Sequence, residues 1–453
     1  MMRVFPFVHE GLGNSSYLVD IGGGNALVID PDRTTRRYLE AADGRGLTIT
    51  GALETHVHAD FVTGAIELKT ATDATIYSPQ GSDARYAHHP VGGGDVLRLG
   101  EAEIEVIAAP GHTPEHVAYV VRVPNGEPVL FSGGSLIVSG AARTDLLTPE
   151  QTEPLSRAQY HTLREAFSGL PDATALYPTH GGGSFCSAGG SGERTSTLGE
   201  QRAANPALAE MSEDEFVEWF PGTFPHVPKY YWRMRAINQA GPRLRRDISR
   251  PKLLDPHHFQ EAGHHGVIVD VRTPEEHLAG HIPNSLGNPF RDAFGVWMGW
   301  LVDLGTPLSF VCDGQPLEQV IDECLLVGHE ELFAVLDGGF AAWEKAGLPV
   351  TDDPYLSPAD ARKQIREGVA ILDVREPDEW ERSRIEGAIH IPLGSLEDRL
   401  DEVPRDRPVL AYCGAGMRST SAASILERAG IETVMSIRGG FSAWESAGEP
   451  VVA

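Results

Sequence analysis

Cys413-Gly414-Ala415-Gly416-Met417-Arg418-Ser419 is a loop of small residues between an apolar run of strand length, residues 409–412, and a helical stretch, residues 419–429. A strand that leads through a short loop into a helix is typical of an α/β domain with a parallel sheet. The amides of such a loop, the start of the helix and the charge of Arg418 would together stabilise a thiolate. We therefore expect Cys413 to be a nucleophile, with Gly414, Ala415, Gly416, Met417 and Ser419 lining an anion-binding pocket.

This loop lies in the second copy of an internal repeat. Residues 267–272, Val-Ile-Val-Asp-Val-Arg, match residues 370–375, and the Gly-Gly-Phe-x-x-Trp element at 338–343 matches residues 439–444. Cys413 also lies 101 positions after Cys312. Three anchors at nearly equal offsets predict a duplicated domain of about 100 residues. With the length of the chain, they predict three domains, at residues 1–245, 252–352 and 355–453.

The first copy has a different loop, Cys312-Asp313-Gly314-Gln315-Pro316-Leu317-Glu318. It has no arginine where Arg418 would align, two acidic side chains lie beside any anion, and proline removes an amide donor. We expect a scaffolding role for this copy. The alternative is a Cys312 that relays sulfur without binding an anion.

The C-terminal repeat resembles the rhodanese family, whose active-site loop begins with cysteine and ends with arginine. The Asp-Val-Arg and Gly-Gly-Phe-x-x-Trp elements are also features of that family. The resemblance implies sulfur transfer through a persulfide on Cys413, between thiosulfate or sulfite and a thiol.

The first 245 residues present histidines on three separate loops that follow apolar runs. These are Thr55-His56-Val57-His58-Ala59-Asp60-Phe61, Pro110-Gly111-His112 and Tyr177-Pro178-Thr179-His180. Imidazoles gathered from several strand ends are how zinc and iron sites are commonly built. The pattern predicts a metal site; the alternative is a metal-free fold that kept some of these histidines.

The histidine pattern, together with Arg143-Thr144-Asp145, resembles the metallo-β-lactamase fold, an αββα sandwich, and within it the persulfide dioxygenases, with glyoxalase II as a relative. The resemblance implies Fe(II), or alternatively Zn(II), on a face of His56, His58 and His112, with Asp60 and His180 left for a second position. It also implies glutathione persulfide as substrate and Arg143 as a substrate-binding residue. Phe61 replaces a second-position histidine, and Gly134 replaces the bridging aspartate. Both departures count against a two-metal hydrolase.

Cys186 follows His180 by six positions in a glycine-rich loop. We expect it at the mouth of the metal site, where it would anchor a persulfide. The alternative is a half-exposed loop thiol without a function.

Four function hypotheses remain open at this point. The first is a sulfur-metabolism enzyme that oxidises a persulfide to sulfite at one metal ion and transfers sulfur through Cys413. The others are a sulfurtransferase with a metal-free N-terminal domain, a glyoxalase II-like thioester hydrolase, and a persulfide carrier that serves a protein partner.

Composition limits the partners and the compartment. The chain has 64 acidic and 37 basic residues, a formal net charge of −27, which disfavours nucleic acid and anionic membranes as partners. We find no apolar run of membrane-spanning length, and four cysteines do not form a disulfide framework. The chain is expected in the cytoplasm with reduced thiols. A homodimer agrees with the resemblance, although no stretch specifies an interface.

Overall fold

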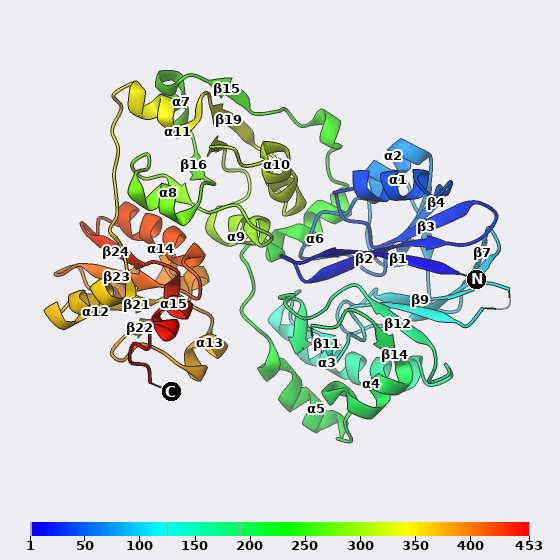
Figure 1. The fold of residues 1–453 in the computed structure, drawn as a ribbon. Coiled ribbons are helices and arrows are strands. Elements are labelled where there is room, and N and C mark those ends of the chain that lie inside the picture. Colours follow the sequence, from blue (N-terminus) through cyan, green and yellow to red (C-terminus); the bar gives the residue numbers. More distant parts are fainter. Residues whose placement is uncertain (1, 125, 190–191, 453) are drawn as a thin grey trace. The chain divides into compact units, whose positions relative to one another are not determined.

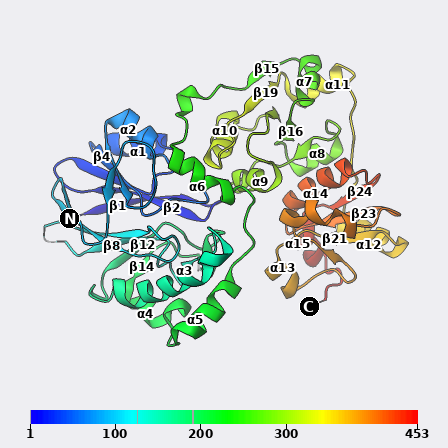
Figure 2. The same ribbon diagram turned by 180° about the vertical axis from the view of Figure 1, so that it is seen from behind.

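The computed structural model describes residues 2–124, 126–189 and 192–452. These residues form two compact units, shown as ribbons in Figure 1 and from behind in Figure 2. Unit 1 comprises Met1–Ile248 and Asp322–Gly328. Unit 2 comprises Ser249–Ile321 and His329–Ala453.

Unit 1 alternates strands with short helices. Its strands are β1 (Arg3–His9), β2 (Asn14–Asp20), β3 (Asn25–Ile29), β4 (Thr48–Leu53), β5 (Thr75–Pro79), β6 (His89–Val91), β7 (Val96–Leu99), β8 (Ala102–Ala108), β9 (Val117–Arg122), β10 (Val129–Gly133), β11 (Gly140–Ala142), β12 (Ala175–Pro178), β13 (Ser187–Gly189) and β14 (Ser196–Thr197). Its helices are α1 (Arg36–Asp43), α2 (Ala65–Thr72), α3 (Pro149–His161), α4 (Leu198–Ala204), α5 (Glu213–Trp219) and α6 (Tyr231–Ala240).

Two mixed sheets face each other in unit 1. Within the described residues, each large sheet has six strands, in the orders β1-β2-β3-β4-β5-β6 and β14-β12-β10-β9-β8-β7. Tyr17 and Leu27 of one sheet pack against Tyr119 and Phe131 of the other in one apolar cluster. Helices α1 and α2 cover the outer face of the first sheet, and α3, α4 and α5 lie beside the second (Figure 1). Because the central strands are covered on both faces, β2 and β10 are buried along almost their whole length.

Unit 2 contains the two repeats. The first has β15 (Lys252–Leu254), α7 (Pro256–Gly263), β16 (Val267–Asp270), α8 (Pro274–Ala279), β17 (Leu286–Gly287), α9 (Phe294–Leu301), β18 (Leu308–Val311), α10 (Leu317–Leu326), β19 (Leu332–Leu336) and α11 (Gly339–Lys345). The second has β20 (Tyr355–Leu356), α12 (Pro358–Glu367), β21 (Ala370–Asp373), α13 (Pro377–Arg382), β22 (Ile389–His390), β23 (Val409–Tyr412), α14 (Met417–Arg428), β24 (Val434–Ile437) and α15 (Gly440–Ser446).

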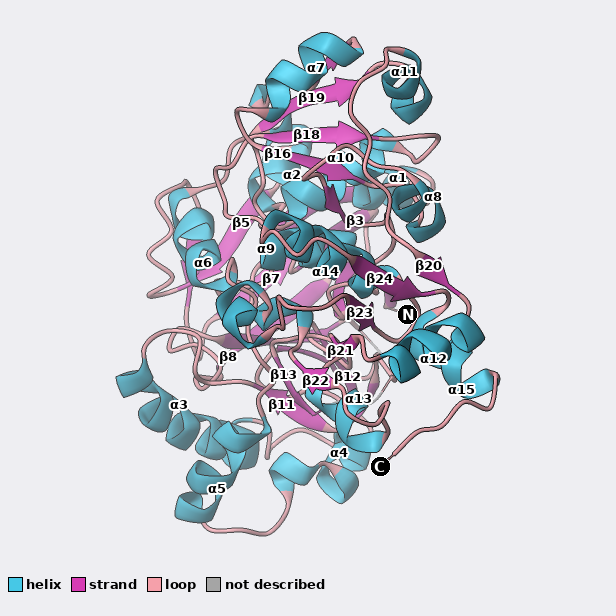
Figure 3. Cartoon of the chain, turned by 90° about the vertical axis from the view of Figure 1, so that its left-hand side faces the viewer, coloured by secondary structure: helices cyan, strands magenta, loops and turns pink. Residues whose placement is uncertain are grey.

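Each repeat is built on one parallel sheet, and the strand orders correspond: β15-β19-β18-β16-β17 and β20-β24-β23-β21-β22. Figure 3 shows β19, β18 and β16 side by side and pointing the same way. Matched side chains fix both copies. Arg272 pairs with Asp270 as Arg375 pairs with Asp373, and the Trp444 indole donates to a backbone carbonyl six residues later, as does its counterpart in the first copy.

The predicted fold class, an αββα sandwich followed by two α/β domains with parallel sheets, is confirmed. Among the described residues, no helix has both the length and the apolar character that a membrane crossing requires.

Candidate functional site

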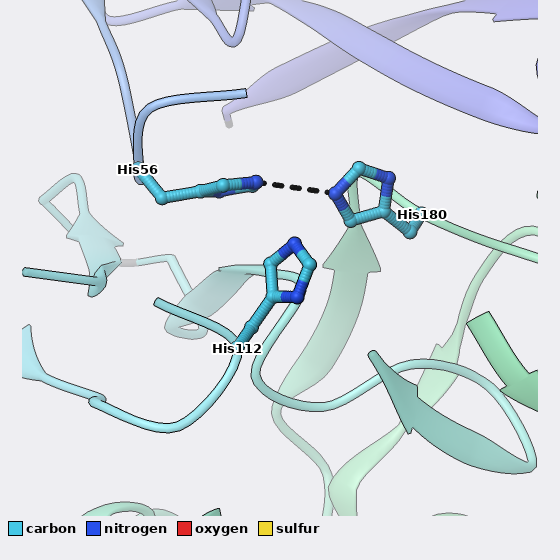
Figure 4. A group of neighbouring side chains, drawn as sticks. All are labelled: His56, His112 and His180. Carbon is cyan, nitrogen blue, oxygen red and sulfur yellow. Dashed lines mark hydrogen bonds between the residues drawn. The ribbon is translucent and has the colours of Figure 1, made fainter. Parts of the chain in front are cut away.

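Three histidines from different loops of unit 1 converge at the carboxyl ends of strands. His56 follows β4, His112 follows β8, and His180 follows β12. All three are buried, and one ring nitrogen of each lies within 4.8 Å of the others. Figure 4 shows the three rings pointing toward a common point. Nε2 of His56 and Nε2 of His180 lie 3.2 Å apart.

Hydrogen bonds fix the tautomers of two of these rings. His112 Nδ1 lies 2.6 Å from the carbonyl oxygen of Arg143 and therefore donates to it. His180 Nδ1 lies 3.0 Å from Oδ1 of Asn14, whose amide nitrogen is held by Asp60 at 2.5 Å, so His180 Nδ1 donates as well. In both rings the proton is on Nδ1, and the lone pair on Nε2 faces the cluster. A second hydrogen bond of this kind orients almost every metal-binding histidine.

The third ring follows the same rule through a hydroxyl. Thr55 Oγ1 donates to Asp30 at 2.8 Å, so it accepts a hydrogen bond from His56 Nδ1 at 2.9 Å. The lone pair of His56 Nε2 is thus turned toward that of His180. Two lone pairs at 3.2 Å repel each other, and a cation between them removes the repulsion. Nε2 of His112 is buried without a hydrogen-bond partner among the described residues. The three nitrogens fit a metal ion.

The electrostatics of the cluster keep the rings of His56 and His112 neutral. Burial, reinforced by the neighbouring histidines, holds the pKa of His56 and of His112 far below the ordinary value. Neutral imidazole is the form that binds a metal.

A second group consists of His58, Asp60 and His180. His58 Nε2 lies 3.2 Å from Asp30 Oδ1. Burial disfavours the charge of His58, but Asp30 outweighs this effect and raises its pKa. The ring of Phe61 stacks on His58 at 4.2 Å between centroids. His58 also groups with Asp30 and His56. Among the described residues, His180 rather than His58 groups with both His56 and His112. The expected ligand face of His56, His58 and His112 stays a prediction.

Gly134 lies directly against the ligand cluster. A Cβ atom at this position would be 2.7 Å from His112 Cδ2 and 3.0 Å from His180 Cδ2. The Gly134 amide donates to Nε2 of His116 at 3.0 Å, which makes His116 a support of this backbone. Without a side chain at Gly134, the two ligand rings occupy the space that an aspartate would need.

Arg143, expected to bind substrate, is engaged by the protein. Its Nε and Nη2 donate to Asp145 at 2.6 and 2.8 Å, and its Nη1 donates to the carbonyls of Phe185 and Pro225 at 3.1 and 2.7 Å. The carbonyl of Arg143 accepts from His112. The side chain thus anchors the loop that orients His112, and four of its five N–H groups are engaged by the protein.

Cys186 is completely buried beside Asp60 and Tyr231, so it is not a half-exposed loop thiol. Burial, together with the charge of Asp60, raises the pKa of the thiol well above its ordinary value. Cys186 lies next to the second histidine group, as its sequence position suggested, but it stays protonated at neutral pH and is a poor nucleophile.

The sulfur-transfer loop in unit 2 has the expected form. Cys413 follows β23 and is 1% exposed, and its sulfur accepts from the amides of Gly416 at 3.2 Å and Ser419 at 3.4 Å. Gly416 has φ +97°, a left-handed conformation that lets the loop curl around the sulfur. The arrangement can hold a thiolate or the terminal sulfur of a persulfide.

Arg418 is paired with acidic side chains beside this cradle. Its two terminal nitrogens pair with both oxygens of Glu379, at 2.6 and 2.8 Å, and Glu376 lies 3.8 Å away. Burial raises the pKa of Glu376 to about 7, although Arg418 opposes this shift. The charge of Arg418 is therefore largely compensated by Glu379 and Glu376, which lie far from Arg418 in the sequence.

The loop of the first repeat is arranged differently. The Asp313 carboxylate accepts from the amide of Phe340 at 2.9 Å, whereas the equivalent amide, of Phe441, donates to the carbonyl of Cys413 at 2.7 Å. Burial, with Asp270 and Asp313, raises the pKa of Cys312 to about 12. Cys312 is therefore a neutral thiol without an anion cradle.

Sequence reasoning missed the residues that orient the ligands, above all Asn14 and Asp30. Both are uncharged or paired polar residues at strand ends, and Asp30 has φ +46°. The only signal available in the sequence was the acidic residue Asp30, directly after the apolar run at 26–29.

Comparisons with known proteins agree with this architecture. Residues 9–180 match the metallo-beta-lactamase superfamily, and residues 255–346 and 357–447 each match the rhodanese-like domain. The chain is 30% identical over 194 residues to the mitochondrial persulfide dioxygenase ETHE1 of Mus musculus, covering 43% of this chain and 70% of that protein. It is 38% identical over 159 residues to a hydroxyacylglutathione hydrolase of Methylobacillus flagellatus, covering 35% of this chain and 58% of that protein.

A crystal structure of a metallo-beta-lactamase from Staphylococcus aureus subsp. aureus COL is similar over 74% of this chain and 99% of its own, with 27% identity and a TM-score of 0.66. The match therefore extends beyond the N-terminal unit. Together with the histidine cluster and the repeated parallel sheets, it shows that the chain belongs to the metallo-β-lactamase superfamily and carries two rhodanese-like domains.

Proposed function

We propose that the chain is a sulfur-metabolism enzyme with two activities. Unit 1 oxidises a low-molecular-weight persulfide, such as glutathione persulfide, to sulfite at a mononuclear iron site, and Cys413 transfers sulfane sulfur. The observation that carries the proposal is the convergence of three imidazole nitrogens, from His56, His112 and His180, in a chain that also has a sulfur-transfer loop around Cys413. Similarity to persulfide dioxygenases supports the choice of substrate.

His56, His112 and His180 would hold the metal, and His112 and His180 are kept in the binding tautomer by their Nδ1 partners. Ferrous iron in this site would supply a Lewis-acidic, redox-active centre for the reaction of persulfide with O2. The overall reaction balances as RSSH + O2 + H2O → RSH + SO3²⁻ + 2 H⁺. Burial of the histidine cluster excludes bulk water from the reacting sulfur.

Sulfur transfer at Cys413 is a nucleophilic displacement. The thiolate attacks the outer sulfur of thiosulfate, the S–S bond of the donor breaks, and sulfite leaves with the bonding electrons. The amides of Gly416 and Ser419 stabilise the negative sulfur before and after the transfer. A thiol acceptor then takes the outer sulfur and restores Cys413.

One specific observation favours a second candidate, a glyoxalase II-like thioester hydrolase. His58, Asp60 and His180 form a further group that could hold a metal, and the chain resembles hydroxyacylglutathione hydrolases. Such hydrolysis would need both positions filled. Phe61 stacked on His58 and the missing carboxylate at Gly134 speak against it.

The test begins with anaerobic reconstitution of the full chain with ferrous iron, followed by O2 uptake on addition of glutathione persulfide. We expect about one iron per chain, with uptake that His112→Ala abolishes and Cys413→Ser leaves unchanged. Two metal ions per chain with turnover of S-lactoylglutathione would establish the hydrolase instead. Failure to retain any metal would leave sulfur transfer as the only activity.

A further inference from the structure

The two repeats contact each other through the helix that begins at the Cys413 loop. Ser421 Oγ donates to the carbonyl of Gly287 at 2.6 Å, and the amide of Gly287 donates to Ser424 Oγ at 2.9 Å. These bonds hold β17 of the first repeat along α14 of the second. The segment that follows β17 therefore runs beside the N-terminal part of α14, where Arg418 and Ser419 lie.

Arg291 lies on that segment, four residues after Gly287, and its guanidinium is oriented by its own loop. Its Nη1 donates to the side-chain oxygen of Asn288 at 3.1 Å and to the carbonyl of Pro289 at 2.7 Å. Its Nη2 is buried and has no hydrogen-bond partner among the described residues. A buried N–H of a charged group that lacks a hydrogen-bond partner destabilises the folded chain. The Nη2 atom of Arg291 is therefore available to a ligand that would pair with it.

The sulfur site lies within electrostatic reach of Arg291. Burial lowers the pKa of Arg291 to about 10, Cys413 acts to raise this pKa and Arg418 to lower it. The guanidinium therefore remains charged at neutral pH. Cys413, in the other repeat, is thus one of the groups that act electrostatically on Arg291.

The charges around Cys413 leave a role for a second cation. Arg418 is paired with Glu379 through two hydrogen bonds and has Glu376 as a further neighbour. This group of three side chains carries no net positive charge, so a doubly charged donor would gain little from it. Arg291 is half-buried, its Nη2 atom is buried, and it has no acidic partner within salt-bridge distance in the described part of the chain.

We propose that Arg291, supplied by the repeat whose own loop has lost the arginine, binds the anionic sulfur donor at Cys413. The first repeat is then not only a scaffold, because it provides one of the two guanidinium groups of its neighbour's site. Arg291 holds the sulfonate end of a donor such as thiosulfate, and after the S–S bond breaks it holds the leaving sulfite. The inference rests on the proposed sulfur transfer at Cys413, but the binding it predicts can be measured without turnover.

The experiment uses the full chain with Cys413→Ser, which cannot react, and titrates thiosulfate by isothermal calorimetry. Adding Arg291→Gln is expected to weaken thiosulfate binding between about tenfold and about one hundredfold, the effect of losing one charged hydrogen-bonding group. Adding Arg291→Lys should restore part of the affinity. Arg291→Met, which keeps the apolar stem, provides a second neutral variant if the glutamine variant does not fold.

Arg428 provides the matched control. It is an arginine at the opposite end of α14, donates to the carbonyl of Asn284 at 3.1 Å, and contacts the same repeat. Arg428→Gln should change thiosulfate binding less than about twofold, because it lies about 15 Å along the helix from the loop. Equal affinities for the Arg291 variants and their parent, or no thiosulfate binding by Cys413→Ser, would overturn the inference.

Turnover separates this inference from the proposed function. In the chain with Cys413 intact, Arg291→Gln should raise KM for thiosulfate more than it lowers kcat. If the wild-type chain transfers no sulfur to cyanide while Arg291-dependent binding is present, the proposed activity fails and the anion site remains.

Discussion

Adding a single methyl group at Gly134 should weaken metal binding without removing any ligand. The Cβ atom of Gly134→Ala would lie 2.7 Å from His112 Cδ2, 3.0 Å from His180 Cδ2 and 3.0 Å from the Cβ of Ala142. Ordinary carbon contacts are about 3.5–4.0 Å, and such overpacking costs about 1–3 kcal/mol. In the metal-free chain the rings can move aside to relieve this crowding. Metal binding has to bring them back, so most of the cost appears in the affinity.

The dissociation constant should therefore rise roughly 5- to 150-fold. We would measure it by competition with a chromophoric chelator, using zinc in air and ferrous iron without oxygen. Gly169→Ala is the matched control, because nothing lies within 4 Å of a Cβ at that position. Its affinity should equal that of the parent. A Gly134→Ala chain that binds metal as tightly as the parent would refute the packing of His112 and His180 against Gly134.

Three further predictions follow from the two sites. His112→Ala should lose the metal, whereas His58→Ala should retain most of it, as measured by elemental analysis after reconstitution; the opposite result would assign the metal to the group around His58. Cys413→Ser should abolish sulfur transfer from thiosulfate to cyanide, and Cys312→Ser should leave the rate within about twofold, because the buried Cys312 thiol stays protonated. The raised pKa of Glu376, about 7 against an ordinary 4.5, means that its contribution to stability is lost as the pH rises from about 4.5 to about 7. Glu376→Gln should therefore raise the unfolding temperature of unit 2 at about pH 8.5, by an amount equivalent to up to roughly 3 kcal/mol, and change it little at about pH 4.5; equal shifts at both pH values would contradict this.

Much of the fold could be predicted because its signals are local and repeated. The strand, loop and helix around Cys413 are adjacent in the sequence, and the second copy of the Asp-Val-Arg element gives the same register twice. The helix starts are equally local. In both repeats the helix after the strand of the Asp-Val-Arg element, β16 or β21, begins with a capping box followed by proline, at Thr273-Pro274 and Glu376-Pro377.

The metal site could be predicted only in part, because the residues that select the ligands are distant in sequence. The histidines themselves were evident from their strand-end loops. Asp30, which contacts His58, and Asn14, which orients His180, are recognised only when the strands are brought together. The partners of Arg143 could not be predicted for the same reason: Phe185 and Pro225 come from loops whose positions the sequence does not give.

Each unit departs from its family's pattern at one place. In unit 1 a metal-binding carboxylate is absent at Gly134, and in unit 2 the loop of Cys312 has no arginine. In unit 1, His180 groups with His56 and His112 directly beside Gly134, the position that lacks a carboxylate. In unit 2, the loop of the first repeat has no anion cradle. The same repeat contacts α14, and this contact brings Arg291 toward Cys413. The Nη2 atoms of Arg291 and of Arg428 are both buried without a hydrogen-bond partner among the described residues. Arg291 differs in that Cys413 acts on it electrostatically, so the substrate of the neighbouring repeat is the partner that we infer for its free donor.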